Sequence, residues 1–241
     1  MIKNTFTILF EDDNIVAVNK PSGLLTVPDR FDQNIPSLKN LLRDKFGVIF
    51  VIHRLDRDTS GLLLFAKNEI AHKFYSAAFE QREIEKKYLG IVYGFFANPE
   101  GTFNKPIAPH FKVEGKMMVD KKGKPSVTHY KVIEKYNFYS FAEFKIETGR
   151  THQIRVHLQD HGNPIVCDEL YSNNEPIFLS KIKKKFNLSK NELEERPLLQ
   201  RLALHSHYLS FTNQEGKIFA IEAPMPKDMQ ACLQQLRKNS K

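Results

Sequence analysis

The sequence contains no tryptophan and only two cysteines, and these absences exclude several classes of protein. Cys167 and Cys232 lie far apart with no second pair, so neither a disulfide framework nor a cysteine-type zinc site is predicted. No window approaches the length of a membrane span, and Glu11, Asp12 and Asp13 come before any long apolar run, so we expect neither a transmembrane helix nor a secretory signal. These features predict a soluble, cytoplasmic protein with reduced thiols.

Motifs for cofactor binding are also missing from the sequence. The chain has no phosphate-binding glycine loop, no dinucleotide fingerprint and no Ser-His-Asp set. A group of histidines with Asp168 has the composition of a metal site, but His152 and His157 are five residues apart and fall on different faces of a helix. His157 and His161 lack a third ligand. We therefore expect chemistry that needs neither a metal nor a nucleotide cofactor.

The residues that are present describe a folded, basic protein. At 241 residues the chain is long enough for one large or two small domains, and 19 phenylalanines need a protein interior. Lys and Arg outnumber Asp and Glu by 36 to 28, which gives a net charge of +8. A basic balance favours a polyanionic partner over an acidic small molecule.

Hydrophobic periodicity, turn residues and helix caps divide the chain into short elements. We expect strands over residues 7–10, 15–18, 49–52, 62–65, 88–96, 127–133, 138–147, 202–211 and 219–221, and helices over 38–46, 69–82, 151–161 and 227–237. Ser37 is the expected N-cap of the first helix and Gly47 its end. Because strands cluster in hairpins without regular strand-helix alternation, the predicted class is α+β with a mixed, mainly antiparallel sheet flanked by helices.

Two of these segments also predict which side chains are buried. In the helix over 69–82 the apolar residues at helical spacing are Ile70, Ala71, Phe74, Ala77 and Ala78. In the strand over 138–147 the alternating apolar residues are Phe138, Ala142, Phe144 and Ile146. Each set is expected to face the core.

Two charged segments look like insertions. Residues 105–124 hold six lysines against Glu114 and Asp120, a net charge of +4, which favours contact with phosphates. Residues 172–201 carry a lysine run followed by Glu192, Glu194 and Glu195, the pattern of a charged helical excursion. For this second segment a solvated surface helix is favoured over an RNA-binding element.

The stretch from His53 to Gly61 concentrates ionisable side chains between two apolar runs, Ile49–Ile52 and Leu62–Phe65. These runs predict a charged loop between two buried strands. Charged groups are costly to hold beside a core unless they meet something polar, so the loop marks a functional site.

Asp56 is the candidate for catalysis in this loop. Its neighbours Arg54 and Arg57 favour the ionised carboxylate, which suits a nucleophile or a base and does not suit an acid. Local chemistry leaves a second interpretation open, in which Asp56 orders the turn by accepting hydrogen bonds from Ser60 or the backbone. A glycosidase pair of Asp56 and Asp58 is weaker, because the chain has no tryptophan to stack on a sugar.

The segment Gly149–His157 is the second concentration of functional side chains. It lies at an expected helix start, where free amide groups and the helix dipole favour anions. Arg155 on that helix is placed to present its charge to Asp56 or to a phosphate. A structural interpretation, in which Arg155 lies along its own helix, stays open.

Several motifs, in order along the chain, resemble those of the RluA-type pseudouridine synthase family. The matching stretches are Lys20–Leu25, His53–Asp56 with Thr59–Leu62, Lys87-Tyr88 and Gly149–Arg155, with further similarity at Gly123–Thr128, His161–Ile165, Leu204-His205 and Glu222–Pro226. Their order and spacing match over most of the chain, which is far more specific than any single motif.

The resemblance implies that the protein isomerises uridine to pseudouridine in RNA. That reaction breaks the bond between N1 and C1′, turns the uracil and joins C5 to C1′ without a redox cofactor or a metal. By similarity, Asp56 is the essential nucleophile or base, Tyr88 stacks on the uracil, and Arg155 pairs with Asp56. An aromatic residue that merely fills the core is the alternative for Tyr88.

The resemblance also implies how RNA is bound. Arg54 is expected to fill the space left by a flipped uridine, because flipping is unfavourable and a cation can stack and hold phosphates. His53, Arg150 and Lys20 are expected to contact RNA as well. The implied fold is one catalytic domain over residues 1–241 with a central RNA-binding cleft, acting as a monomer on a ribosomal or transfer RNA stem-loop.

Departures from the family pattern and rival functions complete the prediction. Cys167 and Ser172 stand where the family usually has glycine, which puts the loop geometry there in question. The first motif begins at Lys20, so no accessory N-terminal RNA-binding domain is expected.

The rivals are an RNA-binding or ribosome-assembly factor with the same fold but no reaction, and a metal-dependent phosphodiesterase that uses the histidines.

Overall fold

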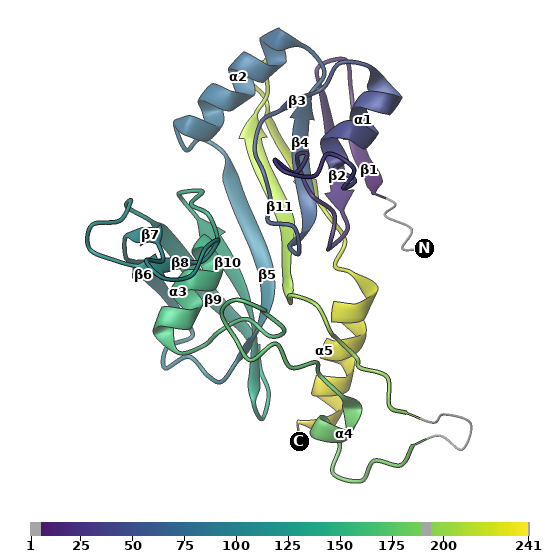
Figure 1. The fold of residues 1–241 in the computed structure, drawn as a ribbon, viewed down its shortest axis with the longest axis vertical. Coiled ribbons are helices and arrows are strands. Elements are labelled where there is room, and N and C mark those ends of the chain that lie inside the picture. Colours follow the sequence, from purple (N-terminus) through teal and green to yellow (C-terminus); the bar gives the residue numbers. More distant parts are fainter. Residues whose placement is uncertain (1–5, 189–193, 241) are drawn as a thin grey trace. The chain divides into compact units, whose positions relative to one another are not determined.

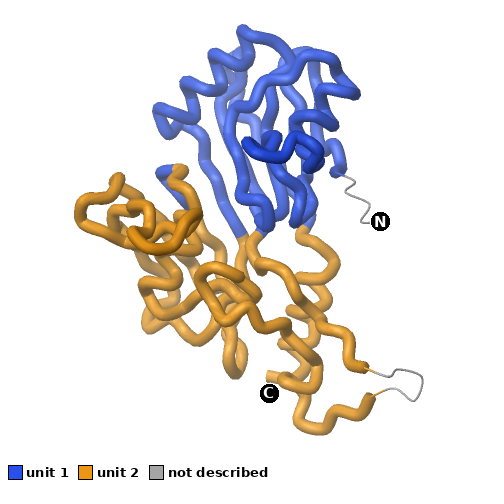
Figure 2. The backbone as a smooth tube through the Cα atoms, in the orientation of Figure 1, with its two compact units in different colours: residues 1–88, 145–148, 205–224 blue, residues 89–144, 149–204, 225–241 orange. Residues whose placement is uncertain are grey.

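The computed structural model describes residues 6–188 and 194–240. Contacts divide the chain into two compact units, which Figure 2 draws in different colours. Unit 1 comprises residues 1–88, 145–148 and 205–224, and unit 2 comprises residues 89–144, 149–204 and 225–241. The prediction of one catalytic domain stays a prediction. Within the part of the chain that the structure describes, no helix is long and apolar enough to cross a membrane.

Unit 1 is built around the strand β4 (Figure 1). This strand is buried along its whole length. Its strands are hydrogen-bonded in the order β1-β2-β4-β11-β5, with β3 also on β4 and β12 on β11. The bounds are β1 (Thr7–Glu11), β2 (Ile15–Lys20), α1 (Leu38–Phe46), β3 (Phe50–Val51), β4 (Ser60–Ala66), α2 (Glu69–Glu80), β5 (Glu85–Tyr93), β11 (Leu204–Thr212) and β12 (Ile218–Glu222). β4 pairs parallel with β11 and antiparallel with β2 and β3, so this sheet is mixed, as predicted.

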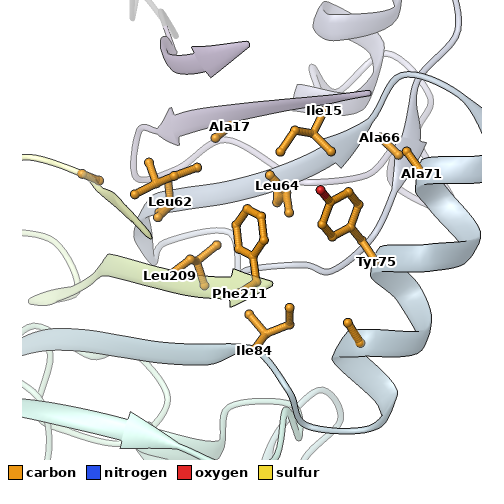
Figure 3. Packing of buried hydrophobic residues seen from close by; sticks show 13 residues of the cluster. Ile15, Ala17, Leu62, Leu64, Ala66, Ala71, Tyr75, Ile84, Leu209 and Phe211 are labelled. Carbon is orange, nitrogen blue, oxygen red and sulfur yellow. The ribbon is translucent and has the colours of Figure 1, made fainter. Parts of the chain in front are cut away.

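The core of unit 1 lies between the sheet and α2 (Figure 3). Leu62 and Leu64 of β4 face the same side because strand side chains alternate. Tyr75 of α2 points toward Leu64 and packs edge-on against Phe211 of β11, with ring centroids 5.4 Å apart. A strand covered on both faces reads as a continuous apolar run, and β4 has that sequence.

Helix α1 begins and ends as predicted, whereas the buried face of α2 differs. Ser37 accepts a hydrogen bond from the Asn40 amide, and Gly47 ends α1 with a φ of 78°. The buried residues of α2 are Ala71, Tyr75 and Ala78. The prediction that Ile70 and Phe74 are buried is wrong, because 76% of Ile70 and 38% of Phe74 are exposed. The core packs on the face of α2 that includes Tyr75. This aromatic residue was not among the apolar positions that the sequence predicted to be buried.

Unit 2 contains the remaining strands and three helices of the described chain. Its strands are hydrogen-bonded in the order β5-β10-β9-β6, and β7 and β8 form a separate antiparallel pair. The bounds are β6 (Glu100–Asn104), β7 (Ile107–Pro109), β8 (Met117–Val119), β9 (Val127–Lys135), β10 (Tyr139–Ile146), α3 (Gln153–His161), α4 (Leu179–Ile182) and α5 (Lys227–Asn239). Val156 of α3 packs with Ile107 and Tyr171 in a small core beside the β7-β8 pair.

Two predicted details of unit 2 are wrong. α3 begins at Gln153 and not at Thr151, because His152 at its N-cap has a left-handed backbone with a φ of 56°. Phe138 lies before β10 and is 67% exposed, while Tyr139 and Phe141 are buried. The first half of β10 is covered on both faces, so the alternation that predicted a single buried face applies only to its end.

The first charged segment contains a short hairpin, and the second contains less helix than predicted. Residues 105–124 hold the short strands β7 and β8, which form a hairpin. Residues 172–201 contain only the four-residue helix α4 among their described positions. Residues 189–193, including Glu192, lie outside the described residues. The lysine-rich hairpin keeps its predicted role in phosphate binding as a prediction.

Candidate active site

The charged loop leaves β3 and returns at β4, as the sequence predicts. Phe50 and Val51 pair antiparallel with Ala66 and Phe65. β4 is buried, but β3 has only two residues and both are half-buried, so the expectation of two buried strands holds for β4 alone. The loop is therefore anchored to the sheet most firmly at its C-terminal end.

Lys20 holds the segment Pro21–Leu24 and the charged loop together. Its side chain is fully buried, and its ammonium group donates hydrogen bonds to three backbone carbonyls. The distances are 3.0 Å to Pro21, 2.8 Å to Leu24 and 2.7 Å to Arg57. An ammonium has three donors, and carbonyl partners offset part of the cost of its burial. This geometry favours a structural role for Lys20 over the predicted contact with RNA.

Three further contacts fix the charged loop on both sides of Asp56. The Gly23 amide donates to the Arg57 carbonyl at 3.0 Å, and the Ser22 hydroxyl donates to the Asp58 carbonyl at 2.7 Å. On the other side, the Thr26 hydroxyl donates to the Leu55 carbonyl at 2.9 Å. Asp56 therefore lies in a segment whose backbone is tied at Leu55, Arg57 and Asp58.

Replacement of Lys20 tests whether this network holds the loop. Lys20→Met leaves three inward carbonyls without their donor, and we expect a loss of about 3 kcal/mol of unfolding free energy in urea titrations. Pseudouridine formation should fall more than tenfold, since Asp56 loses its fixed position. The control Lys67→Met removes a partly exposed lysine that pairs with Glu11, and should cost about 1 kcal/mol or less. Equal losses in the two variants would contradict the role of Lys20.

Asp56 and Tyr88 lie near each other in unit 1. Asp56 is half-buried at the middle of the loop, and Tyr88 of β5 is buried. Burial raises the pKa of the Tyr88 hydroxyl, and the negative charge of Asp56 raises it further, while a hydrogen bond with Ser206 acts in the opposite direction. The structure thus brings together two of the three predicted catalytic residues.

The C-terminal end of the loop is fixed by close contact with β11. Gly61 has a φ of 115°, and a Cβ at this position would lie 2.1 Å from the Ser206 carbonyl oxygen, so only glycine fits. The Ser60 hydroxyl and His205 Nδ1 are 3.0 Å apart, and His205 Nε2 faces the Ala223 carbonyl at 3.3 Å. Because a carbonyl only accepts, Nε2 carries the proton and Nδ1 accepts from Ser60. His205 thus binds both the Ser60 side chain and the backbone at Ala223.

His53 supports the loop from its N-terminal end. Its Nε2 accepts a hydrogen bond from the Leu64 amide at 3.0 Å, and its ring stacks on Phe79 with centroids 4.4 Å apart. Burial, together with the charge of Lys86, lowers the pKa of His53 to about 3. A neutral imidazole with one nitrogen bonded to the sheet favours a structural role over the predicted RNA contact.

Arg54 and Arg150 have more exposed side chains than Lys20. Arg54 is exposed on the charged loop of unit 1. Arg150, in unit 2, is half-buried, and its Nε donates to the Pro125 carbonyl at 3.3 Å. Guanidinium groups that solvent reaches suit contacts with phosphates, and the RNA-binding role of these two residues stays a prediction.

Arg155 forms a buried ion pair with Asp168 in unit 2. Its Nε and Nη2 donate to the two carboxylate oxygens of Asp168 at 2.7 and 2.8 Å, a bidentate arrangement. The guanidinium also lies over the Tyr171 ring, 4.9 Å from the centroid. Asp168 is held in turn by the backbone amides of Leu170 and Tyr171. The predicted pairing of Arg155 with Asp56 stays a prediction.

The histidines of the sequence-level cluster bind separate partners. His152 Nδ1 lies 2.9 Å from the Tyr171 hydroxyl, and His161 Nδ1 lies 2.7 Å from Asn163. His157 is buried, which lowers its pKa, and its two nitrogens contact Thr128 and the Lys105 carbonyl. Over residues 6–188 and 194–240, no group of three or more His, Cys, Asp or Glu side chains is placed to hold a metal ion.

The two positions that depart from the family glycines have clear conformations. Cys167 has a φ of 57°, in the left-handed region that glycine adopts without strain. The Ser172 hydroxyl accepts from the Asp168 amide at 3.0 Å and donates to the Asp168 carbonyl at 2.9 Å. The serine therefore adds contacts that hold the Asp168 turn, which glycine cannot make.

Sequence reasoning missed two residues that position the site. Asp168 entered only as a member of the histidine cluster, although it is the partner of Arg155. Ser22 entered only as part of the motif Lys20–Leu25, whereas its hydroxyl binds the loop that carries Asp56. One signal for the Ser22 segment was available in the sequence. The apolar residues Ile15–Val18 indicate a buried strand, and Lys20 at its end is therefore expected to be buried as well.

Comparisons with known proteins agree with this fold. Residues 14–160 match the family of RNA pseudouridylate synthases. The chain is 36% identical to ribosomal large subunit pseudouridine synthase D of Buchnera aphidicola subsp. Acyrthosiphon pisum, over 94% of this chain and 72% of that protein. It is also 36% identical to ribosomal large subunit pseudouridine synthase C of Escherichia coli K12, over 95% of this chain and 70% of that protein.

A solved structure gives the same result. Human RNA pseudouridylate synthase domain containing 1 superposes with a TM-score of 0.72 at 28% identity, and the match covers 95% of this chain and 88% of that one. The fold is therefore the pseudouridine synthase fold, a mixed and mainly antiparallel sheet with flanking helices, and it defines an intramolecular isomerase that acts on RNA. The chain belongs to the RluA-type family of RNA pseudouridine synthases.

Proposed function

We propose that the protein isomerises uridines of ribosomal RNA, with Asp56 as the group that attacks or deprotonates the substrate. The observation that carries the substrate class is the similarity, over almost the whole chain, to relatives named as ribosomal large subunit pseudouridine synthases. Transfer RNA is the alternative substrate. A cytoplasmic location, a monomeric state and a central cleft for RNA stay predictions.

The role proposed for Asp56 rests on the way its loop is held. The reaction breaks the bond between N1 and C1′ and forms one between C5 and C1′, after which C5 loses its proton and N1 gains one. A group that acts on successive positions of the uracil and the sugar must stay fixed while the base turns. The bonds at Leu55, Arg57 and Asp58 support such a fixed position for the Asp56 carboxylate.

Tyr88 is proposed as a neutral ring that stacks on the uracil. Burial and the charge of Asp56 raise its pKa, so the phenolate that a base would need is disfavoured in the free enzyme. An aromatic face binds any base and lets it reorient. We therefore assign Tyr88 to holding and guiding the uracil near C5, and not to removing its proton.

One arginine is proposed to pair with the catalytic carboxylate, and two others are proposed to contact the RNA. Arg155, held by Asp168 in unit 2, is proposed to meet the carboxylate of Asp56. Arg54 is proposed to fill the space of the flipped uridine, and Arg150 to contact phosphate. The buried contacts of Lys20 and the stacked ring of His53 make these two residues supports of the loop in our proposal.

Mapping of pseudouridines tests the substrate class. RNA from cells that lack this protein is compared with RNA from cells that contain it, with ribosomal and transfer RNA sequenced separately. We expect specific uridines of large-subunit ribosomal RNA to lose the modification, and purified protein to restore it on the deficient RNA. Loss confined to transfer RNA would replace the proposed substrate, and no loss in either fraction would contradict the proposal.

A further inference from the structure

A buried lysine on β5 lacks a counter-charge in the described chain. Lys86 precedes Tyr88 by two residues, so the two side chains point to the same face of the strand. Only 6% of Lys86 is exposed. Within residues 6–188 and 194–240 its ammonium group forms no hydrogen bond or ion pair, and its contact is with the Phe79 ring, 5.5 Å from the centroid. A desolvated cation without an acidic partner is unfavourable.

The groups around Lys86 add positive charge or none. Burial lowers the pKa of Lys86, and the nearby charge of Arg82 lowers it further. His53 shares the Phe79 ring with Lys86, and its own pKa is lowered by burial and by the lysine charge, so it stays neutral. His53 begins the loop that carries Asp56. The uncompensated charge therefore lies beside the N-terminal end of the catalytic loop.

Arg82 provides a second, independent observation. It follows the last turn of α2 with a φ of 64°, in the left-handed region, and is exposed. Glycine or asparagine usually occupies this position after a helix, and another residue there costs about 1 kcal/mol. A long exposed cation is thus kept at a strained position next to a buried, unpaired one. Both features increase the attraction of this spot for an anion.

We propose that Lys86 and Arg82 bind a backbone phosphate of the RNA, adjacent to the uridine that is held at Asp56 and Tyr88. This inference rests on the proposed function, because the anion arrives as part of the substrate. Residues two apart on a strand are separated by about 6.6 Å, which is a distance of nucleotide size. A phosphate there makes charge-assisted hydrogen bonds with both cations and compensates the buried charge of Lys86.

Lys86→Met is expected to weaken RNA binding without weakening the protein. The affinity for a short fluorescein-labelled oligouridylate is measured over a range of salt concentrations. Loss of one phosphate contact should reduce the slope of log affinity against log salt by about 0.7. The melting temperature should stay the same or rise, because an unpaired buried charge is replaced by an apolar chain of similar length. In turnover assays KM should rise about tenfold with little change in kcat.

Two further variants make the test specific. Arg82→Gln alters an exposed side chain and should reduce the salt slope in the same way. Lys145→Met removes the same charge from an exposed residue of β10 that pairs with Glu85, and should keep the wild-type slope. A wild-type slope in both Lys86→Met and Arg82→Gln, an equal reduction in Lys145→Met, or a lower melting temperature for Lys86→Met would each overturn the phosphate site.

Failure of this inference is distinguishable from failure of the proposed function. If the wild-type protein forms pseudouridine and Lys86→Met keeps the wild-type slope and KM, the phosphate site is wrong and the function stands. If the wild-type protein forms no pseudouridine in ribosomal RNA but Lys86→Met and Arg82→Gln both lose salt slope, the substrate proposal is wrong and the anion site stands.

Discussion

Asp56→Asn is expected to abolish pseudouridine formation, with a loss of at least about a thousandfold in kcat. The substitution keeps the size and most of the hydrogen-bonding capacity of the side chain but removes the negative charge that a nucleophile or base requires. The loop backbone is held by bonds at Leu55, Arg57 and Asp58 that do not involve this side chain, so the fold and the affinity for RNA should change little.

Asp58→Asn is the matched control for this prediction. Asp58 carries the same charge two residues further along the same loop, and its backbone carbonyl accepts from Ser22, which the substitution leaves in place. We expect activity within about threefold of wild type, a difference of less than about 1 kcal/mol in activation free energy. Equal losses in the two variants would show that the charge of the loop, and not Asp56 in particular, supports the reaction.

Asp168→Asn is expected to have a large effect on stability, comparable with that of Lys20→Met. It removes one charge from an ion pair in which Asp168 is fully buried and the Arg155 side chain is 7% exposed. Breaking a buried pair leaves an uncompensated charge and typically costs about 3–5 kcal/mol. Because asparagine still offers an oxygen to the amides of Leu170 and Tyr171, we expect about 3 kcal/mol, measured as a shift of the urea midpoint.

Asp228→Asn supplies the comparison for the buried pair. Asp228 forms the same bidentate contact with Arg201, at 2.6 and 2.7 Å, but its side chain is 40% exposed. Solvent screens such a pair, so the loss should be about 1 kcal/mol or less. A midpoint shift for Asp168→Asn no larger than that for Asp228→Asn would contradict the importance of the buried pair. Activity should fall with Asp168→Asn, since Arg155 loses its anchor.

Much of the local structure could be predicted from the sequence because it depends on neighbouring residues. The cap at Ser37 and the stop at Gly47 bound α1, and the turn between Phe10 and Ile15 joins the first hairpin. Asp56 is a candidate for the same reason, since a cluster of charges beside an apolar strand is visible in the sequence itself. These signals do not need knowledge of distant contacts.

The features that the sequence did not reveal depend on contacts between residues far apart in the chain. Lys20 looks like a surface cation in a turn sequence, and only the position of Arg57, 37 residues away, explains its burial. In the sequence, Asp168 stands among histidines and resembles a metal ligand. Only the structure shows that it binds Arg155. Ile70 follows the apolar period of α2 but faces away from the core that Tyr75 enters. Tertiary packing overrides local pattern in each case.

The division of roles within the motifs is clearer in the structure than in the sequence. Lys20 and Ser22 bind the backbone of the charged loop, Gly61 lets β4 and β11 approach closely, and His53 packs under the loop. We therefore expect substitutions at these positions to act through the placement of Asp56, with losses of stability that accompany losses of activity. Substitution of Asp56 itself should separate the two.

Tritium release from RNA labelled at uracil C5 tests the central claim most directly, because formation of the bond between C5 and C1′ sends the C5 hydrogen into water. The RNA comes from cells that lack the protein and is incubated with purified wild-type protein or with Asp56→Asn. Circular dichroism first establishes that the two proteins are equally folded. We predict release with wild-type protein and none above background with Asp56→Asn. Release by the variant at the wild-type rate, or no release by the wild-type protein, would contradict the account.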